Sequence, residues 1–137
     1  MPENSVPKKQ VVAALIIKDD EILICQRTEH QPHPLKWEFP GGKIEPNEKP
    51  PAALYRELEE ELGIKAEIGP EVATIQHKYA SGTAVELHFY LVKSFEGEIK
   101  NMIFNDVRWV KQTEMPRFDF LEADIALVQQ IAEGTLL

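Results

Sequence analysis

The sequence has almost no cysteine, no long apolar run and no excess of positive charge. Its single cysteine, Cys25, excludes an internal disulfide bond and fits a reducing compartment. The longest apolar run, at residues 11–17, is too short to cross a bilayer. A formal charge of −8 argues against a protein that coats nucleic acid or binds a membrane surface. We therefore expect a cytoplasmic protein with no nucleic-acid partner and no membrane partner.

The chain also lacks the internal repeats, low-complexity tracts and linkers that would divide it into several parts. At 137 residues, about 68% of the unfolded chain's surface can be buried, which is enough for a hydrophobic core. The first ten residues are polar and contain no apolar signal core. We predict a flexible N-terminal tail at residues 1–10 and a single domain at residues 11–137.

Strand-like and helix-like segments are both present, and their order predicts an α/β (α+β) fold. We predict strands at residues 11–17, 21–26, 36–39, 71–79, 84–93 and 107–110, the first two forming a hairpin. One helix is expected to start at Pro50 or Pro51, and a second to cover residues 121–132 and end at Gly134. This order suits a mixed sheet that is covered by helices on both faces.

The most informative feature is an acidic stripe on the first predicted helix. At about 100° per residue, Glu57, Glu60 and Glu61 fall on one side. A separate apolar stripe comprises Pro51, Leu54, Tyr55, Leu58 and Leu62. Glutamate-rich helices usually form a solvated face, but stacked like charges also favour a compensating cation. Arg56 supplies part of that charge, and a hard divalent metal such as magnesium or manganese would supply the rest.

The spacing around this helix resembles the Nudix box, a sequence motif of a hydrolase family. The fixed positions of that motif are matched by Gly42, Glu48, Arg56, Glu57, Leu58, Glu60, Glu61, Gly63 and Ile64. Residues 38–45 narrow the resemblance to the MutT-type nucleoside triphosphate pyrophosphohydrolases, which include CTP pyrophosphohydrolases and 8-oxo-dGTP diphosphatases. The resemblance runs from about residue 11 to residue 131, and it implies the Nudix fold, in which a mixed sheet is sandwiched between helices.

The resemblance also implies which residues act on the substrate. Metal ligands would be the Gly41 carbonyl and the carboxylates of Glu57, Glu60 and Glu61, with Mg²⁺ as the cofactor and Mn²⁺ as the alternative. Arg56 would orient Glu57, and Glu57 would serve as general base, so the predicted catalytic residues are Glu57, Arg56 and Glu60. Attack at the β-phosphorus would release a nucleoside monophosphate and pyrophosphate.

Five further residues are predicted to contact the substrate. Arg27 and Lys43 are candidates for the phosphates, although an exposed arginine at the end of a strand is more often a surface charge. Gly42 is a candidate for close backbone approach, and Phe39 for the core or the pocket wall. By resemblance, Asp124 stands where relatives recognise the base, although an acid in the first turn of a helix also compensates the helix dipole. An ionised aspartate only accepts hydrogen bonds, whereas a protonated one also donates. We expect cytidine nucleotides to be preferred, followed by oxidised purines such as 8-oxo-dGTP.

One position departs from the family pattern. Many relatives carry a metal-binding glutamate six residues before a late tryptophan, and counting back from Trp109 gives Ile103. Asp106 or Glu98 would have to replace that ligand, or the site would use fewer ligands.

Three functions are compatible with the sequence. The favoured one is a triphosphate pyrophosphohydrolase of the nucleotide pool. The second is a Nudix hydrolase of ADP-ribose or dinucleoside polyphosphates, for which Tyr79 is a candidate specificity residue. The third is a non-catalytic Nudix-fold sensor, which the loss of box glutamates would favour, and none is lost. The assembly is expected to be a monomer or a homodimer.

Overall fold

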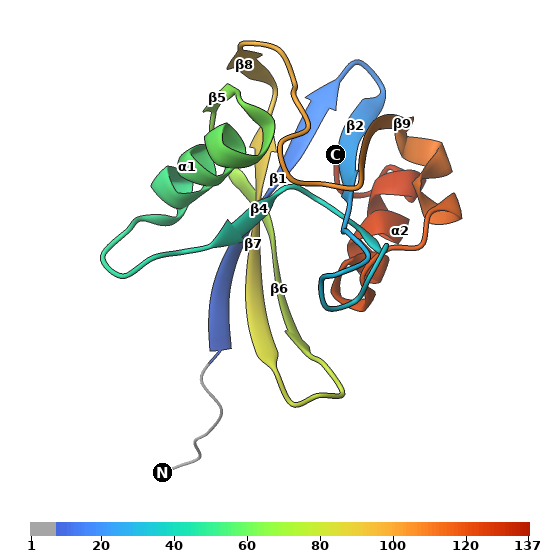
Figure 1. Ribbon diagram of the computed structural model, residues 1–137. Coiled ribbons are helices and arrows are strands. Elements are labelled where there is room, and N and C mark those ends of the chain that lie inside the picture. The colour runs from blue at the N-terminus through green and yellow to red at the C-terminus, as the bar shows by residue number, and fades with distance from the viewer. Residues whose placement is uncertain (1–7) are drawn as a thin grey trace.

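The computed structural model describes residues 8–137 and contains a large mixed sheet between two helical layers (Figure 1). The strands are β1 (Lys8–Lys18), β2 (Glu21–Gln26), β3 (Trp37–Glu38), β4 (Gly41–Lys43), β5 (Lys65–Glu67), β6 (Glu71–Lys78), β7 (Ala84–Val92), β8 (Ser94–Glu96) and β9 (Asp106–Lys111). The helices are α1 (Pro50–Leu62) and α2 (Ile125–Glu133), with two 3₁₀ segments, η1 (Gln112–Arg117) and η2 (Glu122–Asp124).

Strand β1 organises the sheet. The strand order is β3-β2-β1-β7-β6, with β4 also paired to β1 and β9 to β2, while β5 and β8 form a separate two-stranded sheet. β1 runs parallel to β7 over most of its length and antiparallel to β2 and β4. It therefore connects the half of the sheet that carries the glycine turn with the half that carries β9.

Both faces of β1 are buried, which explains why its sequence is a continuous apolar run rather than an alternating one. Val12, Ala14 and Ile16 belong to the core beneath α1. Ala13 and Leu15 belong to the second core, on the α2 side. Figure 1 shows α1 and α2 on opposite sides of the sheet, so side chains on both faces of the strand become part of a core.

Helix α1 carries the acidic stripe, and its ends follow the expected signals. Prolines occupy its first positions, and Gly63 ends it in the left-handed conformation, with φ at 69°. Leu54, Leu58 and Leu62 are fully buried. Tyr55, in contrast, is 38% exposed, and Pro51 is exposed as well, so the predicted apolar stripe is wrong at these two residues.

The predicted mixed α/β fold is confirmed, with corrections at element ends. β1 begins at Lys8, so the predicted tail is wrong for residues 8–10, and residues 1–7 lie outside the described residues. The last helix begins at Ile125 rather than at residue 121, because Leu121 has an extended backbone and η2 precedes the helix. No helix within residues 8–137 has the length and apolar character needed to span a bilayer.

Candidate active site

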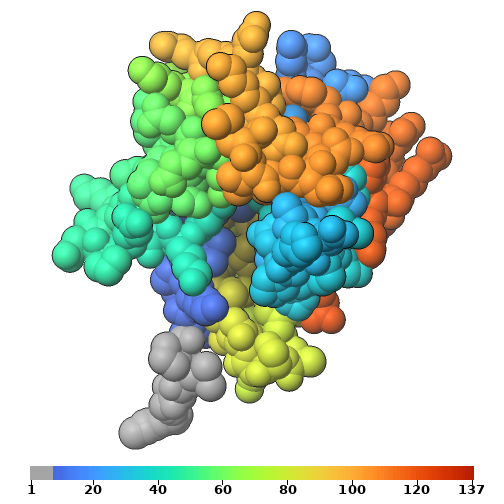
Figure 2. Space-filling model, viewed as in Figure 1, coloured from blue at the N-terminus to red at the C-terminus, as the bar shows by residue number. Residues whose placement is uncertain are grey.

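A cavity of about 280 Å³ opens where the glycine turn, α1 and β1 meet. It is lined by most of the predicted site residues, namely Arg27, Phe39, Gly41, Gly42, Lys43, Glu57, Glu61 and Asp124. Figure 2 shows a hollow on this face between the teal and green segment near residues 40–60, the orange loop and the cyan loop. The predicted residues Arg56 and Glu60 lie outside the lining.

The carboxylates of Glu57 and Glu61 form an acidic pair beside the glycine turn. Glu61 is only 8% exposed, and its Oε1 accepts a hydrogen bond from the Gly41 amide at 3.2 Å. Burial, followed by the negative charge of Glu57, raises the pKa of Glu61 to about 9. Two neighbouring carboxylates in a poorly solvated site cannot both be ionised without a large electrostatic cost. The pair therefore favours either a shared proton or a bound cation.

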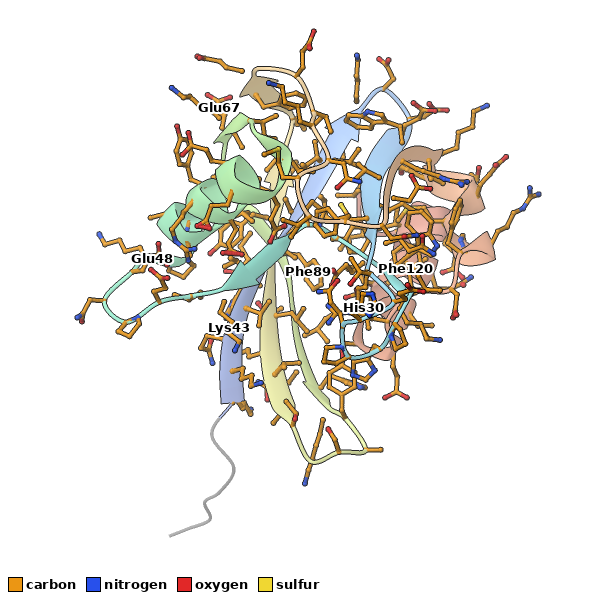
Figure 3. All side chains as sticks on the ribbon, in the orientation of Figure 1. His30, Lys43, Glu48, Glu67, Phe89 and Phe120 are labelled. Atoms are coloured by element: carbon orange, nitrogen blue, oxygen red, sulfur yellow. The ribbon has the colours of Figure 1, made fainter. Side chains whose placement is uncertain are left out.

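Arg56 fixes Glu57 from outside the cavity. Its guanidinium donates two hydrogen bonds of 2.9 Å to Glu48, one of 2.8 Å to Glu57 and one of 3.1 Å to the Lys43 carbonyl. The hydrogen bonds from Arg56 are the main cause that lowers the pKa of Glu48 to about 2. In Figure 3, Glu48 lies beside α1, at the loop that precedes the helix. The expected contact between Arg56 and Glu57 is present, and Glu48 supports it.

Glu60 lies apart from the acidic pair. Its side chain is 56% exposed, and its closest cationic partner is Arg56 at 3.4 Å. The predicted stripe of three glutamates is thus divided between the cavity side, where Glu57 and Glu61 lie, and the solvent side. The role of Glu60 as a metal ligand stays a prediction.

The glycine turn is closely packed between β1 and α1. A Cβ atom at Gly42 would lie 1.8 Å from Oε2 of Glu57, and one at Gly41 would lie 2.0 Å from the Val12 carbonyl oxygen. Neither position can hold a larger residue without displacing its neighbour. The absence of side chains here is what allows Glu57 to reach the backbone of the turn.

Arg27 is a partnered cavity residue rather than an exposed arginine at the end of a strand. Its Nε donates to the Pro32 carbonyl at 2.8 Å, and its Nη1 donates to Glu38 at 3.1 Å. Burial raises the pKa of Glu38, and the Arg27 charge opposes that rise. Phe39 combines the two roles expected of it, because it is buried against Phe89 and also lines the cavity.

Asp124 is a buried carboxyl group in the lining of the same cavity. It is 3% exposed, and no hydrogen bond to its side chain occurs within residues 8–137. Burial, followed by the negative charge of Glu38, raises the pKa of Asp124 to about 8. The group is therefore mainly protonated at neutral pH and offers both a donor and an acceptor to a ligand.

The raised pKa predicts how stability depends on pH. The folded chain holds the Asp124 proton more tightly than the unfolded chain does, so this contribution is complete below about pH 3.8 and is lost as the pH rises through about 8. Asp124→Asn removes the titrating group. We expect the melting temperature of the variant, relative to that of the unsubstituted chain, to be higher at pH 9 than at pH 6. Thermal unfolding at both pH values measures this difference. The exposed Asp119→Asn is the control, and an equal change in both variants would contradict the prediction.

Several residues that complete the cavity were not predicted as site residues. Glu38 was seen only as part of a motif, because sequence does not reveal its ion pair with Arg27. Ile103, 51% exposed, and Phe104 also line the cavity.

The two acids considered as replacements for the missing ligand lie outside this lining. Asp106 pairs with Arg108 at 2.8 Å, and Glu98 is also absent from the lining. Neither acid lines the cavity, so a replacement for the ligand missing at Ile103 stays a prediction.

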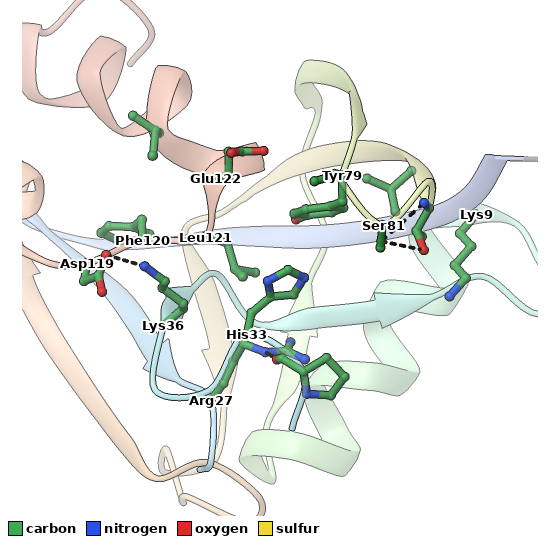
Figure 4. A pocket seen from close by; sticks show the side chains of 15 residues that line it. Lys9, Arg27, His33, Lys36, Tyr79, Ser81, Asp119, Phe120, Leu121 and Glu122 are labelled. Atoms are coloured by element: carbon green, nitrogen blue, oxygen red, sulfur yellow. Dashed lines mark hydrogen bonds and ion pairs between the residues drawn. The ribbon is translucent and has the colours of Figure 1, made fainter. Parts of the chain in front are cut away.

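A larger outer cavity of about 870 Å³ adjoins the first one and shares Arg27 and Leu121 with it. Figure 4 shows the side chains of His33 and Tyr79 close to each other in its lining, with Glu122 to one side of Tyr79. The rings of His33 and Tyr79 lie 4.8 Å apart, and His77 packs edge-on to Tyr79 at 4.6 Å. The outer cavity thus has an aromatic wall formed by His33 and Tyr79.

The donor set at the first cavity fits a divalent metal. Within residues 8–137 there is no ready cluster of three metal-ligating side chains. The acidic pair of Glu57 and Glu61 nevertheless carries oxygen donors only, and the turn at Gly41–Gly42 leaves no room for side chains beside it. Oxygen-only donors favour magnesium or manganese. Glu57, Glu61 and the Gly41 backbone are the groups that would hold such an ion.

The fold, the box helix and the glycine turn together define a Nudix hydrolase. A family model described as the NUDIX domain matches residues 7–131, and the chain belongs to this family. Nudix hydrolases generally use a divalent metal.

Curated relatives are enzymes of the predicted type. The chain is 39% identical over 120 residues to a CTP pyrophosphohydrolase of Escherichia coli, with 88% of each chain covered. It is 35% identical to an 8-oxo-dGTP diphosphatase of Haemophilus influenzae, with 90% of this chain and 92% of that protein covered. The solution structure of the E. coli ORF135 protein matches with a TM-score of 0.83 at 38% identity, covering 94% of this chain and 91% of that one. These similarities confirm the MutT-type resemblance.

Proposed function

We propose that the protein hydrolyses nucleoside triphosphates in the cytoplasm, releasing a nucleoside monophosphate and pyrophosphate in a magnesium-dependent reaction. The observation that carries the proposal is one cavity lined both by an acidic pair and by a further, buried carboxyl group. The acidic pair, Glu57 and Glu61, suits a metal-bound polyphosphate, whereas Asp124 suits a nucleobase. The names of the curated relatives support the same class of substrate.

Different residues of the chain would bind the metal and the phosphates and would accept the proton of the attacking water. Bound magnesium would neutralise phosphate oxygens and acidify a water molecule. Glu57 would accept the proton of that water, and its bond to Arg56 keeps one carboxylate oxygen engaged while Oε2 faces the glycine turn. Lys43, at the cavity rim, would contact phosphate oxygens.

Base recognition is assigned to Asp124. A protonated carboxyl group donates through its hydroxyl and accepts through its carbonyl oxygen. Cytosine offers a matching edge, with a ring nitrogen acceptor beside an exocyclic amine donor. An oxidised guanine also offers adjacent donor and acceptor groups, so we propose CTP or dCTP as the preferred substrate and 8-oxo-dGTP as the next.

A second candidate function is favoured by the outer cavity. ADP-ribose and dinucleoside polyphosphates carry a second group beyond the phosphates, and the aromatic wall formed by Tyr79 and His33 offers a surface for a planar ring. A single substrate panel distinguishes the two candidates.

The test uses purified protein with magnesium and a panel of nucleoside triphosphates, ADP-ribose and diadenosine polyphosphates, with products identified. We expect pyrophosphate and monophosphate from a cytidine or oxidised guanine triphosphate. Release of orthophosphate, or turnover confined to ADP-ribose, would reject the first proposal. Absence of turnover on every substrate, despite nucleotide binding, would instead support the non-catalytic sensor.

A further inference from the structure

A side-chain contact joins two segments of the chain next to Asp124. His77, near the end of β6, places its Nε2 2.7 Å from Oε1 of Glu122, two residues before Asp124. Among the hydrogen bonds of residues 8–137, no other joins β6 to η2. The contact therefore links the sheet directly to the turn that carries the buried carboxyl group.

The opposite side of that turn is held by backbone hydrogen bonds. The Leu121 amide donates to the Trp37 carbonyl at 2.9 Å, and the Trp37 amide donates to the Asp119 carbonyl at 2.9 Å. Segment 119–121 is thus attached to β3, but η2 itself has no side-chain cap. The turn is anchored on its β3 side by backbone and on its β6 side by His77 and Glu122.

The His77 ring is itself held in place. It packs edge-on against Tyr79, with an interplanar angle of 77°, and Tyr79 packs on His33. His77 is 22% exposed at its side chain, whereas Glu122 is 67% exposed. A partly exposed pair of this kind contributes little to global stability. Its effect is expected to be local, on the position of η2.

We propose that the contact between His77 and Glu122 is a positioning clamp that holds η2 in register with the cavity and thereby sets how strongly Asp124 distinguishes one base from another. The clamp rests on the proposed function, in which the base lies against Asp124. Hydrogen-bond recognition depends on atomic positions to within about 0.5 Å, so a small shift of the turn alters selectivity. His77 and Glu122 are positioning residues, since neither needs to touch the base.

The test measures binding of CMP and GMP by calorimetry in the presence of magnesium. The variants are His77→Ala, Glu122→Ala and the double variant. We expect each single variant to lower the ratio of the two affinities by roughly five- to tenfold, because a misplaced recognition group loses affinity steeply. The double variant is expected to lose no more than either single one, because both substitutions remove one contact. Glu122→Gln, which keeps an acceptor oxygen, is expected to restore most of the ratio.

The chain offers a matched control on the opposite face of the same sheet. His88 contacts Glu71 at 2.9 Å, and its neighbours Leu87 and Phe89 belong to the α2-side core, so His88 points the other way. His88→Ala removes a histidine–glutamate contact of the same kind, together with a 3.0 Å contact to Gln10, without reaching η2. It is expected to leave the ratio unchanged.

The kinetic readout separates positioning from general damage. For CTP, the clamp variants are expected to raise KM with less than a twofold change in kcat, because the acidic pair is untouched. An unchanged affinity ratio in a folded His77→Ala, or an equal loss in His88→Ala, would overturn the clamp. A natural chain that binds both monophosphates equally would overturn it as well. Base-selective binding without any hydrolysis would reject the proposed function and leave the clamp standing.

Discussion

Glu57→Gln is expected to lower kcat by roughly 100- to 10,000-fold, the range typical for loss of a general base. Glutamine keeps the size of glutamate, and its amide oxygen can still accept the 2.8 Å hydrogen bond from Arg56. The variant should therefore fold normally while losing both the proton acceptor and a negative metal ligand. Steady-state rates with the preferred triphosphate measure the effect.

The matched control for this substitution lies two residues along the same helix. Glu59 is exposed and outside both cavities, so Glu59→Gln removes the same charge from α1 without touching the acidic pair. We expect a near-normal kcat for Glu59→Gln. The melting temperatures of Glu57→Gln and Glu59→Gln should be equal. Near-normal kcat in Glu57→Gln would contradict the role of Glu57 as general base. An equal loss of kcat in both variants would show that the loss comes from removing a negative charge from α1, and not from Glu57 itself.

Gly42→Ala is expected to be the second most damaging change, with kcat lowered by about 100-fold through displacement of a catalytic group. The added Cβ would lie 1.8 Å from Oε2 of Glu57, so the carboxylate must move. Circular dichroism and thermal unfolding should show that the fold persists, since the glutamate side chain can rotate away.

A double-mutant cycle tests whether the alanine acts through Glu57. Once Glu57→Gln has removed the carboxylate, adding Gly42→Ala should lower kcat little further, because both changes affect one group. Independent losses that multiply would show that Gly42 is needed for another reason, such as close approach of the phosphates, and would refute displacement of Glu57 as the cause.

The sequence predicts the fold where the patterns are long. Three of these patterns correspond to observed elements: the apolar run of β1, the hairpin into β2, and the spacing of Leu54, Leu58 and Leu62 in α1. Three short strands, β4, β5 and β8, were missed, because three residues are too few to show a period of two. The start of α2 was misplaced, because a backbone bond from Leu121 to Trp37, remote in sequence, keeps the turn out of the helix.

The motif predicts part of the candidate site, as the long patterns predict part of the fold. Glu57, Glu61 and the glycine turn line one cavity, as the motif implies. Helical periodicity placed Glu60 with them, but a stripe covers a wide arc, and only the packing against β1 and β4 decides which carboxylates turn inward. The raised pKa of Asp124 could not be predicted, because it depends on burial and on Glu38, a residue far away in the sequence.

The most direct test of the account follows Mn²⁺ binding by NMR, with a nonhydrolysable nucleoside triphosphate present. Paramagnetic broadening should appear first at the amide signals of Gly41, Glu57 and Glu61, and excess Mg²⁺ should reverse it. Glu57→Gln should weaken the effect. Broadening centred elsewhere, with these three signals unaffected, would contradict the claim that the acidic pair holds the metal and, through it, the phosphate chain.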